Sequence, residues 1–270
     1  MWRTIPITEA IKLEFETDKF ANGFKNTIDW MLTDSHGKMI IDDLKYFKAN
    51  KNSLEIDPES VEALRLIIKL IKTSGFRLKP KNLDDKINSF IKQYGEDFRT
   101  SSAKNELIKL VGDRKKKNIE QLLSYPTLKQ FTDNLHVLAS QKDTEVLGEK
   151  GRDNYLRDFG YWDRIPIDIH EMRFIIRSGI YHKFSKVERS DHSNKSDLHS
   201  ALTRFCNECL NGYSVEEIDL GISPGIVDTF IWSFSADDRY NICGVKPKCG
   251  ECRLNEVCLY SLINNKPSPA

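Results

Sequence analysis

Four cysteines near the end of the chain constrain its fold more than any other feature. They follow the pattern C-x5-C-x2-C-x5-C and are Cys243, Cys249, Cys252 and Cys258. Thiolates are soft metal ligands, and the x2 step lets two sulfur atoms reach one metal centre from a tight turn, which Pro247 and Gly250 favour. Four thiolates suit zinc or an iron–sulfur cluster. Zinc sites usually join two short steps across a longer gap, so one x2 step between two x5 steps favours a 4Fe–4S cluster.

We expect these cysteines to be reduced, because the start of the chain does not read as a secretion signal. Residues 1–20 contain no apolar segment of the signal-peptide type, and their four acidic residues argue against a transit peptide. No apolar run reaches the roughly 18 residues that a membrane-spanning helix requires. A reducing compartment without a membrane partner is therefore expected, and there cysteines usually serve metal binding or catalysis.

Two further cysteines, Cys206 and Cys209, form a second C-x2-C step. They share one face of a predicted helix with Leu202, Phe205 and Leu210. Cysteine packs as a small hydrophobic residue, so we interpret this pair as part of the core rather than as a second metal site.

Apolar residues recur mostly at helical spacing, so the predicted fold class is mainly α. Asp57 and Pro58 predict the start of a helix whose apolar stripe runs from Val61 to Ile71 and ends near Gly75. Further helices are predicted over residues 83–94, 103–111, 127–140, 151–159, 168–177, 198–210 and 224–235. Only residues 11–16 alternate like a strand, and residues 183–199 predict an exposed loop.

Charge is unevenly distributed along a chain whose formal net charge is only +1. Residues 51–200 hold 28 Lys and Arg against 23 Asp and Glu, whereas residues 201–270 hold 6 against 9. The basic run over residues 114–117 is typical of a solvated helix face or turn. The total charge therefore neither favours nor excludes a nucleic-acid partner.

The cysteine segment resembles the iron–sulfur loop of endonuclease III and its relatives. Residues 246–252 read Lys-Pro-Lys-Cys-Gly-Glu-Cys and are followed by Cys258. The first gap is commonly six residues in that family and is five here, which makes this loop one residue tighter. The resemblance implies a 4Fe–4S cluster bound by the four cysteines.

A second segment resembles the helix-hairpin-helix-GPD superfamily of DNA glycosylases. Ile165-Pro166-Ile167-Asp168 resembles the Gly/Pro-rich element and the aspartate that name the superfamily, and a predicted helix follows. Upstream, Gly148-Glu149-Lys150 and the Tyr-Leu-Arg-Asp-Phe-Gly stretch over residues 155–160 are similar to the archaeal 8-oxoguanine glycosylase branch. Lys150 precedes Asp168 by 18 residues, which is the separation between the Schiff-base lysine and the catalytic aspartate in bifunctional members.

The hairpin departs from the family pattern at Val146, where the first glycine of G-x-G-x-K usually stands. Glycine lets backbone N–H groups approach a phosphate closely, so the phosphate contact is expected to differ while the position of Lys150 is retained. An alternative register places Asp153 at the lysine position. That register requires a helix several residues shorter, so we prefer Lys150.

The resemblance implies chemical roles for two residues. Asp168 is the expected catalytic carboxylate, which stabilises positive charge at C1′ or deprotonates the nucleophile; its structural alternative is the N-cap of the following helix, and one residue can fill both roles. Lys150 is the expected nucleophile, and its alternative is an exposed lysine at a helix start. His170 is expected to orient a loop or pack in the core, and Arg173 and Arg177 to face carboxylates or phosphate.

Phosphate contacts are expected from hairpin N–H groups and from basic residues. The candidates are Gly148, Gly151, Arg152, Lys246 and Lys248. The residue that fills the gap left by a flipped base is expected within residues 60–145, where the resemblance gives no residue-level assignment.

The resemblance implies a two-lobed helix-hairpin-helix DNA glycosylase fold with a 4Fe–4S cluster loop. Residues 1–60 are expected to pack with the cluster lobe, residues 61–160 to form a six-helix barrel with the hairpin, and residues 161–270 to hold the catalytic aspartate and the cluster. The implied function is base excision repair: removal of a damaged, oxidised base from double-stranded DNA by a monomer, with AP lyase cleavage. The compartment is then the prokaryotic cytoplasm or another reducing compartment that contains DNA.

Three alternatives remain open at this stage. A monofunctional glycosylase would use water as nucleophile, and Lys150 would then only contact DNA. A non-catalytic iron–sulfur protein would bind DNA or sense redox state without excising a base. A zinc protein would use the same four cysteines for a structural metal.

Overall fold

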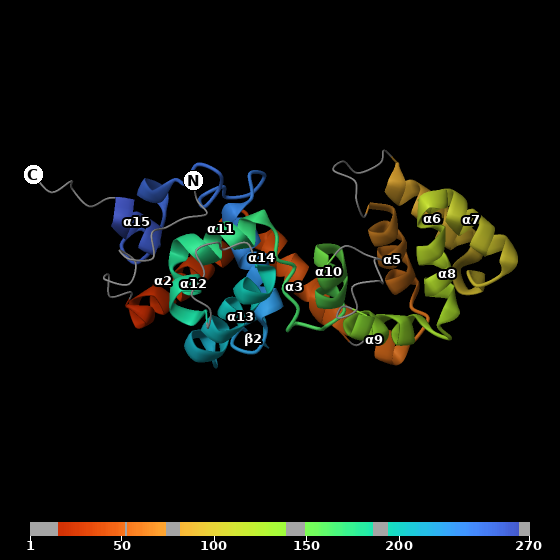
Figure 1. Cartoon of the computed structure of the whole chain (residues 1–270), viewed down its shortest axis with the longest axis horizontal. Helices are drawn as coiled ribbons and strands as arrows, with labels where there is room; N and C mark the ends of the chain where they lie inside the picture. Colours follow the sequence, from red (N-terminus) through yellow and green to blue (C-terminus); the bar gives the residue numbers. More distant parts are fainter. Residues whose placement is uncertain (1–15, 52, 74–81, 139–148, 186–193, 265–270) are drawn as a thin grey trace, which may run out of the picture. The chain divides into compact units, whose positions relative to one another are not determined.

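The computed structural model describes residues 16–51, 53–73, 82–138, 149–185 and 194–264 (Figure 1). These residues are mainly helical, which confirms the predicted fold class at that level. The chain divides into two compact units: one combines Met1–Lys45 with Ile167–Ala270, and the other is Tyr46–Pro166. The sequence places the corresponding boundaries near residues 60 and 160.

The first unit brings the amino-terminal helix together with the carboxy-terminal half of the chain. Its elements are α2 (Thr17–Thr33), the start of α3 (Gly37–Lys51), α11 (Ile169–Ser178), α12 (Ile180–Phe184), α13 (Lys195–Phe205), the π-helical turn η3 (Cys206–Leu210), β1 (Ser214–Val215), β2 (Ile218–Asp219), α14 (Pro224–Ser235), η4 (Cys249–Glu251) and α15 (Leu259–Asn264). The two short strands form an antiparallel pair in which Val215 is opposite Ile218. Aromatic rings join α2 to the later helices: Phe24 lies 5.6 Å from Phe174 and 5.7 Å from Phe205 between ring centroids.

The second unit is a helical domain built around α5. It contains the end of α3, α4 (Ser53–Ile56), α5 (Val61–Thr73), α6 (Leu83–Tyr94), η1 (Gly95–Asp97), α7 (Ser101–Val111), η2 (Asp113–Lys115), α8 (Lys116–Ser124), α9 (Leu128–Leu138) and α10 (Glu149–Asp158). The predicted apolar stripe of α5 is buried, since Leu64, Ile67 and Ile71 are fully inaccessible to solvent. Glu59 ties two distant segments, because its carboxylate accepts from Arg99 at 3.1 Å and from the Leu128 amide at 3.1 Å.

Two local predictions are wrong, in each case because a side chain accepts a hydrogen bond from a backbone amide that the sequence pattern did not indicate. Asp57 does not cap α5, which begins at Val61; its carboxylate instead accepts from the Glu59 amide at 3.1 Å and closes a turn. The predicted loop over residues 183–199 ends early, because Asn194 accepts from the Ser196 amide at 3.0 Å and starts α13. The predicted strand, apart from Glu16, and the stop at Gly75 lie outside the described residues.

None of the described helices combines the length and the apolar composition needed to cross a bilayer.

Candidate active site and metal centre

Asp168 is the N-cap residue of α11 and forms a complete capping box. Its carboxylate accepts from the His170 amide at 2.6 Å, and its own amide donates to Glu171 Oε2 at 2.8 Å. These reciprocal bonds satisfy backbone donors that the first turn of a helix otherwise leaves without partners. The carboxylate of Asp168 is therefore held in one orientation, half-buried at the positive end of the helix dipole.

A second carboxyl group, that of Glu171, lies beneath Asp168 and is buried. The Glu171 side chain is 1% exposed, and α14 places Asp228, which is 2% exposed, close to it. Burial, the negative charge of Asp228 and the hydrogen bond with Asp168 raise the pKa of Glu171 well above its usual value. Glu171 thus keeps its proton under conditions in which exposed glutamates lose theirs.

The opposite end of α11 holds the cysteine loop through Arg177. This guanidinium is 3% exposed and donates to three successive backbone carbonyls, those of Cys243 at 3.3 Å, Gly244 at 2.6 Å and Val245 at 3.2 Å. The thiol of Cys258 in turn donates to the Arg177 carbonyl at 3.3 Å. One residue of α11 therefore contacts both ends of the cysteine segment.

Neighbouring cysteines of the loop raise one another's pKa. Cys243 and Cys249 raise the pKa of Cys252, and Cys243 and Cys252 raise the pKa of Cys258. Burial is the main reason that the pKa of each thiol is raised, and the charge of Arg177 opposes this at Cys243. Among the residues that the structure describes, no three Cys, His, Asp or Glu side chains come close enough together to bind a single metal ion.

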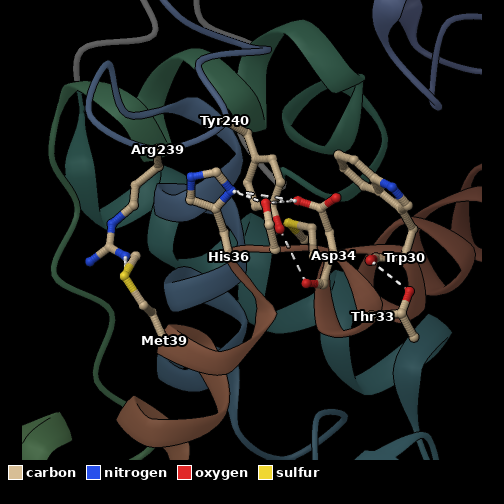
Figure 2. Close-up of polar contacts among 9 residues, drawn as sticks. Trp30, Thr33, Asp34, His36, Met39, Arg239 and Tyr240 are labelled. Carbon is tan, nitrogen blue, oxygen red and sulfur yellow. Dashed lines mark hydrogen bonds and ion pairs between the residues drawn. The ribbon is translucent and has the colours of Figure 1, made fainter.

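Helix α2 supports the cysteine loop from the amino-terminal side. Tyr240 precedes the loop, and its ring lies 4.9 Å from Trp30 and 5.0 Å from His36 between centroids (Figure 2). Arg253, inside the loop, lies 4.8 Å above the same Trp30 ring. Gly23 allows this close approach, because a Cβ atom there would come within 3.2 Å of Val257. Within this unit α2 thus packs directly against the cysteine segment.

The Tyr240 hydroxyl fixes the start of the loop on α2. It donates to the Met31 carbonyl at 3.1 Å, and burial together with Asp34 raises the pKa of Tyr240 to about 12, so the hydroxyl remains protonated at neutral pH. We expect Tyr240→Phe to lower the free energy of unfolding by about 1 kcal/mol, because one net hydrogen bond is lost. Urea unfolding at neutral pH measures this change, and a variant as stable as wild type would contradict it.

The residues predicted from the hairpin lie in the other unit. Lys150 is exposed in the first turn of α10. Gly151 permits close packing of α10 on α5, because a Cβ atom there would lie 2.9 Å from Leu70 Cδ1. Arg152 is only 15% exposed and pairs with the buried Asp153 at 3.4 Å, so its charge is directed at a neighbouring carboxylate. Val146 and Gly148 lie outside the described residues.

The two lysines predicted to contact phosphate, Lys246 and Lys248, are exposed on the cysteine loop. Cys206 is buried, which confirms its place in the core, whereas Cys209 is only half-buried on the π-helical turn, so its assignment to the core is wrong. The π-helical geometry shifts Cys209 from the face that regular helical spacing predicts.

Comparison with protein families, curated proteins and solved structures finds no match to this chain.

Three contributors to the site were not predicted. Glu171 stands three residues after Asp168, and this capping-box spacing is visible in the sequence. Asp228 and Trp30 have no such signal, because their importance comes from long-range packing of α14 and α2.

Proposed function

We propose that this chain is a DNA glycosylase that excises an oxidised base from double-stranded DNA and cleaves the resulting abasic strand as a lyase. One observation carries the proposal: α11 holds a capped, half-buried Asp168 at its first turn and the four-cysteine loop at its last turn. These are the two elements whose sequences resemble the helix-hairpin-helix-GPD glycosylases.

The proposed chemistry uses one carboxylate and one amine. The neutral amine of Lys150 attacks C1′ while the C1′–N bond breaks, and the departing base takes the electron pair and the proton that the amine releases. Asp168 stabilises the positive charge that develops at C1′. The C1′–O4′ bond then opens, O4′ takes a proton, and C1′ forms a Schiff base with Lys150. This Schiff base allows β-elimination, in which the C2′ proton is removed and the 3′ phosphate leaves.

The cysteine loop fits a 4Fe–4S cluster by its donor set. All four donors are cysteine sulfur atoms, and the Leu254 amide already donates to one of them, Cys252 Sγ, at 3.4 Å. Each thiolate of such a cluster binds a different iron, so three side chains need not meet at one ion. When bound, the cluster would cross-link the loop and supply a one-electron redox centre. Iron and acid-labile sulfide in the purified protein support this assignment, and zinc in their place contradicts it.

A panel of duplexes, each with one lesion, tests the proposed activity. We expect wild type to release an oxidised base and to nick the strand without alkali, because the lysine route includes elimination. Borohydride should trap a covalent adduct with wild type and with the control Lys92→Ala, an exposed lysine on α6, but not with Lys150→Ala.

Each of the other possible results would assign a different function or a different nucleophile to this protein. Base release that needs alkali for cleavage and gives no adduct would show a monofunctional glycosylase. An undiminished adduct in Lys150→Ala would assign the nucleophile elsewhere. Release of no base from any duplex would contradict the glycosylase proposal and favour a non-catalytic iron–sulfur protein.

A further inference from the structure

The capping box of α11 differs from the usual form in the burial of its glutamate. A capping-box glutamate ordinarily needs only to reach back to the N-cap amide, and it can stay ionised at the surface. Glu171 makes that contact, 2.8 Å from the Asp168 amide, but its side chain is 1% exposed. An ionised carboxylate buried to this degree is strongly disfavoured, so the neutral form is the stable one.

The groups around Glu171 favour the same protonation state. Its carboxyl is hydrogen-bonded to that of Asp168, and the nearby carboxyl of Asp228, the only ionisable residue of α14, raises the pKa of Glu171 further. Two carboxyl groups can share a hydrogen bond only when one of them carries the proton. Asp168 is half-buried and accepts from the His170 amide, so the more buried Glu171 is the donor.

Other ionisable groups lie on the elements that pack against α11. They are His170, Arg173 and Arg177 on α11 itself, Tyr181, His182 and Lys183 on α12, Lys195, Asp197, His199 and Arg204 on α13, and Tyr260 on α15. The dominant charges at Glu171 are nevertheless Asp228 and Asp168.

We propose that Glu171 is a positioning residue for Asp168: its carboxyl group keeps the proton of the pair and donates a hydrogen bond to the Asp168 carboxylate, which stays ionised and fixed in direction. This inference rests on the proposed function, because it assigns Asp168 the catalytic charge. Two neighbouring carboxyl groups thereby take different roles through their environments.

The proposal predicts a specific dependence of stability on pH. Folded Glu171 keeps its proton above the ordinary value of 4.5, whereas the unfolded chain loses it there. The unfolded state then binds fewer protons, so this residue's contribution to stability falls as pH rises from 4.5 towards the folded pKa. Glutamine makes the same two hydrogen bonds without titrating and should remove this loss.

The test compares Glu171→Gln, Glu171→Leu and the exposed control Glu208→Gln with wild type as the cluster-loaded protein. Thermal unfolding between about pH 5 and about pH 9 should show a gain in melting temperature for Glu171→Gln that grows with pH, and no such trend for the control. Single-turnover base release should persist in Glu171→Gln at high pH, where wild type slows, and should be about tenfold slower in Glu171→Leu at all pH values.

The two readouts separate failure of this inference from failure of the proposed function. Unfolding curves of Glu171→Gln and wild type with the same pH dependence would overturn the inference, and so would base release as slow in Glu171→Gln as in Glu171→Leu. If wild type releases no base, the proposed function fails, and the unfolding comparison still decides which carboxyl carries the proton. If Glu171→Leu does not fold, Glu171→Gln and its control decide alone.

Discussion

Replacing Asp168 with asparagine is expected to slow base release by at least about 100-fold while leaving the fold almost unchanged. In the proposed mechanism the loss follows from removing the negative charge that stabilises the developing positive charge at C1′. The fold is retained because asparagine caps helices as well as aspartate does, so the His170 amide keeps an acceptor at the position that it now finds at 2.6 Å. Single-turnover base release and urea unfolding measure the two effects separately.

Two further variants separate the charge of Asp168 from its role as a cap. Asp168→Ala should show the same loss of rate and should also lower the free energy of unfolding by about 1 kcal/mol, because the cap is removed. Asp163→Asn, an exposed position, should change neither quantity. Base release at the wild-type rate by Asp168→Asn would show that Asp168 only caps α11. A large loss of stability in that variant would show that the carboxylate charge itself is structural.

Local patterns made much of the helical fold predictable. The periodic segments at residues 83–94 and 224–235 form helices with those bounds, because each combines a strong apolar pattern with a clear boundary, such as Pro224 at the first turn of α14. The role of Asp168 as an N-cap was predictable for the same reason, since its carboxylate needs only the next turn of chain.

The features that could not be predicted from the sequence depend on packing between residues far apart in the chain. The weakly patterned α3, on which charged residues interrupt the apolar positions, gave no clear signal. Burial of Glu171 depends on α14, which is more than 50 residues further along the chain. Arg152 looked like a phosphate ligand because it is basic and follows the hairpin, but its side chain is largely covered and paired with Asp153. A residue type gives its possible chemistry, whereas the fold decides whether it meets solvent.

Removal of the Arg177 guanidinium, which holds the cysteine loop from α11, is expected to destabilise this loop more than truncation of any side chain within the loop. Arg177→Ala should lower the free energy of unfolding by about 3 to 5 kcal/mol, because three carbonyls in a buried site lose their donor. Arg177→Lys should lie between alanine and wild type, since an ammonium cannot reproduce the planar fork that reaches Gly244 and Val245 together.

Measuring the iron content of each variant together with its stability shows whether Arg177→Ala acts through the cysteine loop or through a general packing defect. If Arg177 holds the loop in a form that binds the cluster, the purified Arg177→Ala protein should contain less iron and sulfide per chain than wild type. Arg65→Ala, which breaks a half-exposed ion pair with Glu62 in the other unit, should cost less than about 1 kcal/mol and keep the full iron content. Full iron content in Arg177→Ala would show that the cysteines alone organise the loop. An equal loss in both variants would trace the effect to the overall fold, because the polar contacts of Arg65 are to Glu62 and Asn88 of its own unit.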